Sequence, residues 1–256
     1  MKKSFYYVLV ALISCILVCC KDKSNEVVIT GQLEGVEDGV AIKLMKLYGS
    51  ELIDIQTDTI VNGAFKFAFM DSLNQPKSML IMAEGEGFPP TWLELWVIPG
   101  ANIGIAGKDK LIRSWEVNSA VAEQIELNKY SERIRQHEKI AQSIMQETFS
   151  CIDEMYKSPE KTEELEARVE ELYAINDSIS IIISETEINL MDENKTYSPV
   201  WMEKLERYAT SLQYAKLSDT YVEKLKKMYE GMSNEFKNSE KGRTIHLNLY
   251  SSASVN

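Results

Sequence analysis

The feature that most constrains this chain is a change in hydrophobic period near residue 118. From residue 26 to about residue 117, apolar side chains alternate with polar ones, as in strands that are buried on one face. After residue 119 the apolar side chains recur at three- and four-residue steps, which is typical of amphipathic helices. We therefore expect an α+β chain, with an antiparallel β-sandwich or a partly open barrel followed by a helical segment of about four helices.

Turn signals divide the first part into short strands. Asn62-Gly63 is the clearest signal, because this pair favours the two-residue type I′ turn of a β-hairpin. Asp38-Gly39 marks an earlier turn and Pro99-Gly100 a later one. The alternating segments between such signals are 27–33, 41–47, 51–57, 64–69, 92–98 and 102–107.

Capping residues mark where the helices begin. The first helix follows residue 119, the second follows Ser158-Pro159, the third Ser198-Pro199, and the fourth begins near Ser218. A serine can cap a helix and a proline fits its first turn. The expected organisation is a β domain over 26–117, a helical segment over 118–241 and a C-terminal tail over 242–256.

The N-terminus has the layout of a secretory signal. Lys2 and Lys3 precede an uncharged run from residue 5 to residue 19, and polar residues return at position 21. The run is short for a transmembrane helix, which needs about 20 apolar residues. The string LVCCKDKS resembles a bacterial lipoprotein signal, with Cys20 as the acylated residue and Cys15 as the alternative. Residues 1–19 would then be a signal peptide, and residues 20–25 a tether to the membrane of the cell envelope.

The charge balance argues against a nucleic-acid partner. The chain has 39 acidic and 28 basic side chains, a net charge of −11, and basic residues that form no stripe. Binding to phosphates needs clustered Lys and Arg. The acidic residues are spread along the expected helices, which favours a solvated surface over a cation site.

Residues that could carry catalysis are few. The chain has two histidines, and His137 lacks the second histidine four residues later that a zinc-protease helix needs. His246 has no evident acid beside it. Cys151 is the one cysteine outside the N-terminal region, and it is expected to be a small core residue, with a redox role by mixed disulfide as the alternative. We expect a protein that is not an enzyme and holds no cofactor and no metal.

One strand could present a ligand-binding surface. The alternation WLELW places Trp92, Glu94 and Trp96 on one face, and tryptophans can stack on sugars. Packing of these side chains in the sheet is the alternative, because large aromatics chiefly form cores. The preceding loop, residues 84–91, contains Phe88 and has the Gly- and Pro-rich composition of a recognition loop. Phe88, Trp92, Glu94 and Trp96 are the candidate ligand-binding residues.

Three stretches carry a resemblance to a known family. ITGQLEGVEDGVAIKLMKL, LIDIQTDTIVNGAFKF and LELWVIPGANIGIAGKD resemble the β domain of unknown function that precedes the thioredoxin domain in TlpA- and AhpC-type envelope lipoproteins of Gram-negative bacteria. The later string MSNEFKNSEKGRTIHLNL is similar to the helical linker of those proteins. The thioredoxin domain and its CxxC have no counterpart here, so no catalytic residue carries over.

The resemblance implies the accessory half of a thioredoxin-like lipoprotein. The expected function is a non-catalytic binding or accessory module, anchored by acyl chains at the outer membrane and facing the periplasm or the cell surface. Its partner would be an envelope protein or a small ligand. The alternatives are a shortened or atypical thiol-disulfide oxidoreductase that uses Cys151, and a glycan or peptide binder that uses Trp92 and Trp96.

Overall fold

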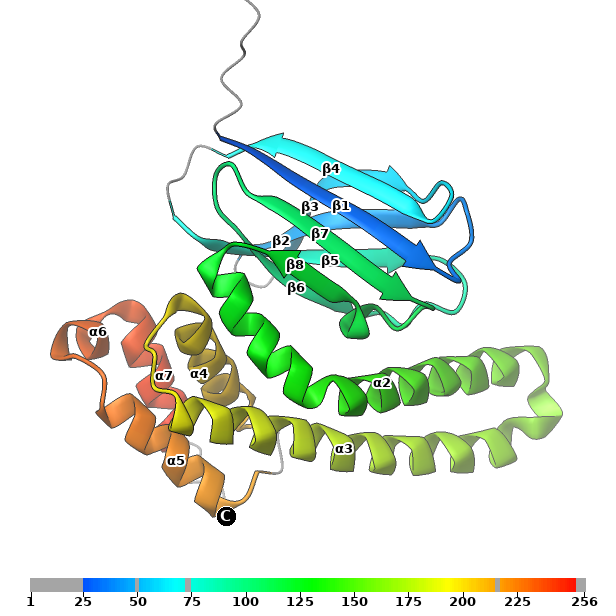
Figure 1. The fold of residues 1–256 in the computed structure, drawn as a ribbon. Coiled ribbons are helices and arrows are strands. Elements are labelled where there is room, and N and C mark those ends of the chain that lie inside the picture. The colour runs from blue at the N-terminus through cyan, green and yellow to red at the C-terminus, as the bar shows by residue number, and fades with distance from the viewer. Residues whose placement is uncertain (1–24, 49–50, 72–74, 215–216, 252–256) are drawn as a thin grey trace, which may run out of the picture.

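A computed structural model describes residues 25–48, 51–71, 75–214 and 217–251 (Figure 1). A two-layer β domain comes first and is followed by a helical part that lies below one end and one edge of it. The eight strands are β1 (Glu26–Glu34), β2 (Ala41–Tyr48), β3 (Glu51–Thr59), β4 (Ala64–Met70), β5 (Lys77–Glu84), β6 (Trp92–Val97), β7 (Asn102–Lys108) and β8 (Glu116–Ser119). The α+β prediction, with strands first and helices second, is confirmed.

The strands form two four-stranded sheets with the orders β4-β1-β7-β8 and β3-β2-β5-β6. The second sheet is antiparallel throughout. In the first sheet β7 pairs parallel to β1, with Ile29 opposite Ile103. This mixed sheet differs from the expected antiparallel one. Between β1 and β7 the chain forms β4 and all four strands of the second sheet, and this long connection is what allows β7 to pair with β1 in the same direction.

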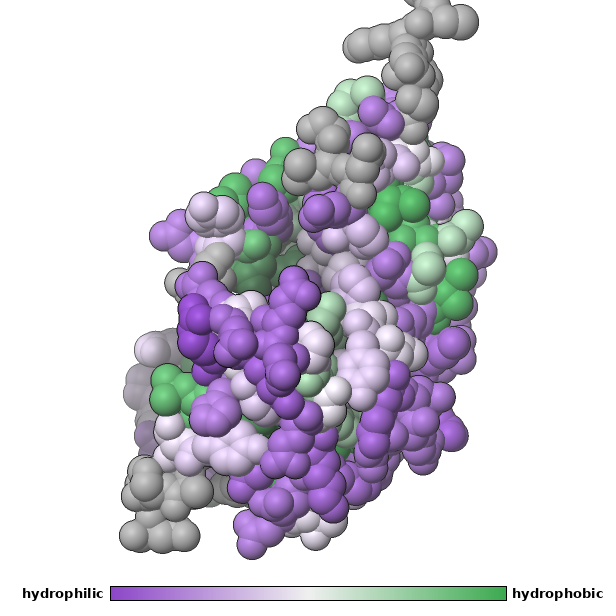
Figure 2. Space-filling model, turned by 90° about the vertical axis from the view of Figure 1, so that its left-hand side faces the viewer, coloured by the Kyte–Doolittle hydropathy of each residue, from purple (hydrophilic) through white to green (hydrophobic). Residues whose placement is uncertain are grey.

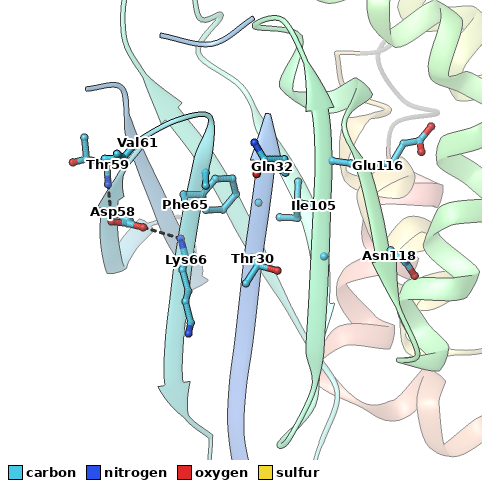
Figure 3. Close-up of a pocket in the computed structure, with 14 residues that line it drawn as sticks. Thr30, Gln32, Asp58, Thr59, Val61, Phe65, Lys66, Ile105, Glu116 and Asn118 are labelled. Atoms are coloured by element: carbon cyan, nitrogen blue, oxygen red, sulfur yellow. Dashed lines mark hydrogen bonds between the residues drawn. The ribbon is translucent and has the colours of Figure 1, made fainter. Parts of the chain in front are cut away.

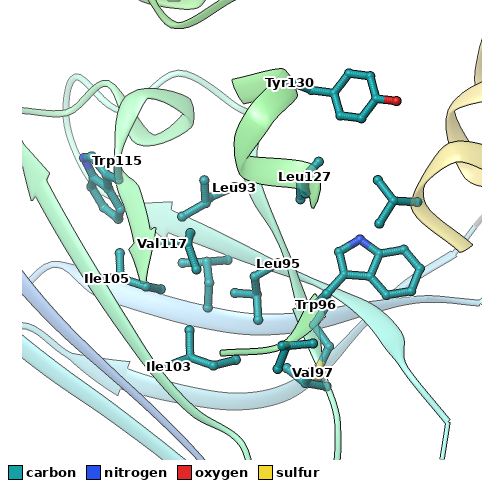
Figure 4. Close-up of a cluster of buried hydrophobic side chains, with 14 of the residues drawn as sticks. Leu93, Leu95, Trp96, Val97, Ile103, Ile105, Trp115, Val117, Leu127 and Tyr130 are labelled. Atoms are coloured by element: carbon teal, nitrogen blue, oxygen red, sulfur yellow. The ribbon is translucent and has the colours of Figure 1, made fainter. Parts of the chain in front are cut away.

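The sandwich core explains the alternation seen in the sequence. Phe65 and Phe67 of β4 are both buried, and their rings lie 5.6 Å apart. Figure 4 shows Leu93, Leu95 and Val97 of β6 pointing to the same core as Ile103 and Ile105 of β7. Gly31 of β1 lies directly against the Phe65 ring, where an added Cβ would come within 1.8 Å of it. The first sheet therefore needs a glycine at this position.

The expected hairpin turn at Asn62-Gly63 is present. Both residues have positive φ angles, of 52° and 72°, as a type I′ turn requires. Val61 and Ala64 form the bridge that closes the turn. Asp38, in the turn before β2, accepts a hydrogen bond of 2.7 Å from the Asn62 N–H. This contact ties the turn to the neighbouring loop.

Strand β5 was not anticipated from the sequence, and the reason is its burial. Met79, Leu80 and Ile81 are all buried, so the strand is apolar on both faces and shows no alternation. One face meets the sandwich core. Ser78 of the same strand donates a hydrogen bond of 3.4 Å to Glu203 of the helical part, which shows that helices cover the other face. A short continuous apolar run cannot be assigned by periodicity alone.

The helical part begins with a long antiparallel pair. Helix α2 (Ala122–Lys157) and helix α3 (Thr162–Glu193) are joined by the short 3₁₀ helix η3 (Pro159–Lys161) and run beyond the edge of the sandwich (Figure 1). The first two helices thus begin where the sequence predicted. Among the described residues, no helix is long and apolar enough to cross a membrane.

Four shorter helices follow, so the described chain has six α-helices instead of about four. They are α4 (Pro199–Ser211), α5 (Asp219–Glu230), α6 (Asn234–Asn238) and α7 (Glu240–Ser251). Ser198 caps α4 by accepting a hydrogen bond of 3.0 Å from the Trp201 N–H, as its Ser-Pro sequence indicated. Residues 242–251, expected to be a tail, belong to α7. They are helical because Ile245 and Leu249 are buried where α7 packs against α4 and α5.

Candidate functional site

Strand β6 presents its candidate residues to the helices. Trp92, Glu94 and Trp96 lie on the face opposite Leu93 and Leu95, as the alternation predicted. Trp96 is only 1% exposed and points toward the helical part, away from the sandwich core (Figure 4). Its Nε1–H donates a hydrogen bond of 3.3 Å to Glu94 Oε1. Trp92 is 39% exposed, so Trp92 alone of the two tryptophans presents its ring to solvent.

Glu94 lies at the edge of a buried charged group that the sequence analysis did not identify. We call Glu187, Lys204, Arg207 and Tyr208 the Glu187 cluster. Lys204 Nζ lies 2.7 Å from Glu187 Oε1, and Arg207 Nη2 lies 3.0 Å from Glu187 Oε2. The Tyr208 hydroxyl donates to the same carboxylate. Arg207 Nη1 also lies 3.6 Å from Glu94 Oε2, which links the cluster to β6.

The cluster is shielded from water on the inside and open at Arg207. The side chains of Glu187 and Lys204 are 4% and 5% exposed, whereas that of Arg207 is 47% exposed. Burial by itself raises the pKa of Glu187, but the cations of Lys204 and Arg207 outweigh it and lower the pKa to about 2. Burial lowers the pKa of Lys204, and the Glu187 carboxylate opposes that shift. Glu187 is therefore an ionised carboxylate at neutral pH, held between two cations.

A second acid at this junction behaves in the opposite way. Glu203 of α4 accepts a hydrogen bond from Ser78 of β5 and lies near Glu94. Burial, reinforced by the negative charge of Glu94, raises the pKa of Glu203 to about 7. The contact between the sheet and α4 thus contains a carboxyl group that titrates near neutral pH.

Polar side chains of α2 fasten the helical part to strand edges and loops of the β domain. Gln124 Oε1 accepts a hydrogen bond of 2.7 Å from the Trp96 N–H, at the outer edge of β6. Gln142 Oε1 accepts one of 2.8 Å from the Arg113 N–H in the 3₁₀ helix η2 (Ile112–Ser114). The Arg113 guanidinium lies 3.1 Å from Glu138 Oε2. These contacts satisfy buried polar groups, as a fixed joint between two parts requires.

The hollow at this joint is small. It has a volume of about 70 Å³, comparable to a few water molecules, and its lining includes Trp92, Glu94, Glu138, Glu187, Lys204 and Arg207. A drug-sized ligand needs about 300 Å³ or more. The charged side chains around it are paired with one another. We therefore interpret the Glu187 cluster as the joint between sheet and helices.

Phe88 does not join Trp92 and Glu94. Its ring packs edge-on against Trp115 at 6.4 Å between centroids, and the ammonium of Lys110 lies 5.8 Å from the ring centroid. The loop itself is held to α2, because Gln146 Nε2 donates a hydrogen bond of 2.7 Å to the Gly87 carbonyl. Phe88 is half-buried, so its ring contributes packing at the base of the loop.

Cys151 and His246 are not among the residues that line this joint. Cys151 is half-buried on α2. His246 is exposed and stacks on Tyr250 at 4.7 Å. Cys15 and Cys20 lie outside the described residues. Within the described ranges, no three His, Cys, Asp or Glu side chains come together in a way that could hold a metal ion.

A larger hollow lies elsewhere, on the outer face of the sheet β4-β1-β7-β8 (Figure 3). We call it the sheet trough. It is open to solvent and has a volume of about 810 Å³. Small residues form its floor, among them Gly104 and Ala106 of β7 and Ala64 of β4. Because the side chains at these outward positions are short, they leave the backbone of the strands uncovered.

Polar side chains border the sheet trough on both sides. Lys66 and Asp58 lie along one side, and Glu116 and Asn118 of β8 lie along the other (Figure 3). Asp58 Oδ2 accepts a hydrogen bond of 2.7 Å from the Lys66 N–H, which joins the edge strands β3 and β4 of the two sheets. The sequence signal for this feature is the pair of small residues at alternate positions of β7, Gly104 and Ala106.

Comparison with known proteins yields no relative: no protein-family description, no curated protein and no solved structure matches this chain.

Proposed function

We propose that this protein is a non-catalytic binding or accessory module of the Gram-negative cell envelope, anchored through acyl chains on Cys20, and that it binds its ligand or partner in the sheet trough. The observation that carries the binding role is the trough itself. Its volume of about 810 Å³ lies in the range of ligand sites, and its lining mixes apolar floor with polar rim.

The lining favours a polar ligand with both donors and acceptors. Thr30 and Gln32 lie in the middle of the sheet. The Thr30 hydroxyl donates a hydrogen bond of 3.5 Å to the Ile103 carbonyl and Gln32 Nε2 one of 3.3 Å to the Asn62 carbonyl, and the side-chain oxygens of both residues can accept from a ligand. Lys66 supplies a cation on one side. On the other side the Glu116 carboxylate is ion-paired with Arg135 through Oε1. A glycan or an extended peptide would match this mixture, since each combines hydrogen-bonding groups with apolar faces.

The non-catalytic part of the proposal rests on how the acids and bases are used. Glu187 is engaged by Lys204, Arg207 and Tyr208, and Glu138 is engaged by Arg113. A general base must instead reach a substrate proton, with room for the substrate beside it. The hollow of about 70 Å³ beside these groups offers little such room.

The anchor is tested by expressing the full chain with its N-terminal segment in a Gram-negative host. We expect an intact mass that matches cleavage before Cys20 plus acyl chains, and partitioning into the detergent phase. Cys20→Ala should abolish both, whereas Cys15→Ala should leave both unchanged. A soluble chain of unmodified mass would refute the anchor.

The binding site is tested by calorimetric titration of the same protein against a panel of envelope glycans and short peptides. We expect at least one ligand to bind, and Ala106→Trp, which fills the trough floor, to weaken that binding at least tenfold. The matched control is Asn102→Trp, which changes an exposed position on the same strand outside the trough. Equal binding by the Ala106→Trp variant and the wild type would exclude the trough as the site.

A further inference from the structure

Four apolar side chains are exposed where β2 ends and β3 begins. Leu47 and Tyr48 of β2 are 57% and 67% exposed, and Leu52 and Ile53 of β3 are exposed as well. We call these four residues the hairpin end. Strand β3 is an edge strand, and nothing in the described chain covers its outer side at these residues. Exposed apolar clusters of this kind mark a contact with another surface.

The hairpin end lies at the end of the sandwich where the N-terminal segment enters. The Asp71 N–H donates a hydrogen bond of 3.1 Å to the Asn25 carbonyl, just before β1. Asp71 Oδ1 lies 2.6 Å from Lys77 Nζ, at the start of β5. Because Leu80 is the partner of Met45, Lys77 is level with Tyr48, three residues later on β2. Figure 1 shows the start of β1 and the end of β2 at the same end of the domain.

The length of the tether limits how far this end can lie from the bilayer. Four residues lie between Cys20 and Asn25, and even when fully extended the five Cα–Cα steps span only about 18 Å. If Cys20 is acylated, as proposed above, this end of the sandwich must face the membrane at close range. Figure 2 looks onto this side of the molecule, and most of its hydrophobic surface lies on the β domain rather than on the helical part.

We propose that the hairpin end inserts into the boundary between lipid headgroups and acyl chains, and so forms a second membrane contact beside the acyl anchor. This inference rests on the proposed anchor. The residue types suit the interface, since Leu and Ile are apolar while Tyr combines an apolar ring with a polar hydroxyl. Lys46 lies with its ammonium 5.6 Å from the Tyr48 ring, and its long stem allows the charge to stay at the headgroups.

The proposed contact would also orient the protein. Helices α2 and α3 run from this end of the molecule to the opposite one, where η3 joins them (Figure 1). Tyr156, near that far turn, is 84% exposed. With the hairpin end in the bilayer, the far turn would point into the aqueous compartment, and Tyr156 would be the residue to compare with Tyr48.

The test uses the full-length acylated protein in vesicles of phosphatidylethanolamine and phosphatidylglycerol. In a Cys151→Ser background, Tyr48→Cys and Tyr156→Cys each receive a fluorophore, and lipids with a spin label on the acyl chain act as quenchers. We expect at least twofold quenching of the label at position 48 and none at position 156. Leu52→Asp should reduce the quenching at position 48, whereas Thr57→Asp, farther along β3, should not.

The outcomes separate the two proposals. An acylated protein whose label at position 48 is quenched no more than the one at position 156 would overturn the membrane contact and leave the anchor intact. If the label at position 48 is shielded from water only at high protein concentration and is not quenched by lipid, the membrane contact is overturned in favour of contact with a second copy of the chain. A protein that intact mass shows to be unacylated would overturn the anchor and this inference together.

Discussion

Replacing Glu187 by glutamine should destabilise the protein strongly, because it leaves Lys204 buried without a carboxylate. A pKa of about 2 in the folded chain, against 4.5 for an ordinary glutamate, corresponds to about 3 kcal/mol of stability at neutral pH. Removing one partner of a buried ion pair in other proteins costs about 3–5 kcal/mol. We therefore expect Glu187→Gln to lower the free energy of unfolding at pH 7 by about 3–4 kcal/mol.

The pH dependence gives this prediction a second, independent readout. The pKa of Glu187 is depressed in the folded state, so its contribution is present above about pH 4.5 and is lost as the pH falls toward about 2. The wild type should therefore lose stability steeply over this window. Glu187→Gln should lose less over the same window, because it has no carboxyl group to protonate at this position.

The assay is urea denaturation followed by circular dichroism at several pH values, with thermal melting as a check. At about 2–4 °C per kcal/mol for a chain of this size, the melting temperature should fall by about 6–16 °C at pH 7. Glu170→Gln, at an exposed position on the same helix, is the matched control and should change stability by less than about 0.5 kcal/mol.

A double variant tests whether the effect comes from the pair. Lys204→Met removes the cation. The stability losses of Lys204→Met and Glu187→Gln, added together, should exceed the stability loss of the double variant, because the two residues are in contact. Strict additivity, a loss below about 1 kcal/mol for Glu187→Gln, or an unchanged acid dependence would refute the reasoning.

Three further changes probe other parts of the structure. Because the pKa of Glu203 is raised to about 7, its ionisation opposes folding as the pH rises from about 4.5 to 7. Glu203→Gln should therefore stabilise the protein at pH 8 by about 1–3 kcal/mol, as measured by denaturation at pH 5 and pH 8. Equal effects of the substitution at the two pH values would contradict this. Gly31→Ala should lower the free energy of unfolding by about 1–3 kcal/mol, measured by thermal melting, because the added Cβ would overlap the Phe65 ring. Gly104→Ala should lower it clearly less, because the nearest atom to that Cβ lies at 3.9 Å. Equal losses of stability would show that the Phe65 ring moves aside. Gln124→Ala should lower the free energy of unfolding by about 1–3 kcal/mol, because it leaves the Trp96 N–H without an acceptor. Hydrogen exchange at the Trp96 amide should become faster. An unchanged exchange rate would show that another acceptor replaces Gln124.

Local signals in the sequence determined much of the fold. The period of two and the Asn62-Gly63 pair depend on contacts within a few residues, so the alternating strands and the type I′ turn follow from the chain alone. The same holds for Ser198, whose side chain caps the helix that begins at the next residue. Strand β5 was not predicted, because a strand that is buried on both faces shows no alternation of apolar and polar residues.

Long-range packing decided the rest, because the period of a strand or helix does not say what each face meets. The alternation placed Trp92 and Trp96 on one face, and only the docking of the helical part buried Trp96 (Figure 4) and left Trp92 exposed. Nothing in the sequence marks Lys204 and Arg207 of α4 for burial, since such residues usually lie on the surface of a helix. They instead face Glu187 on α3, 17 and 20 residues away in the chain. Which charges are buried together is a property of the assembled fold, and it decides which acids and bases hold the protein together.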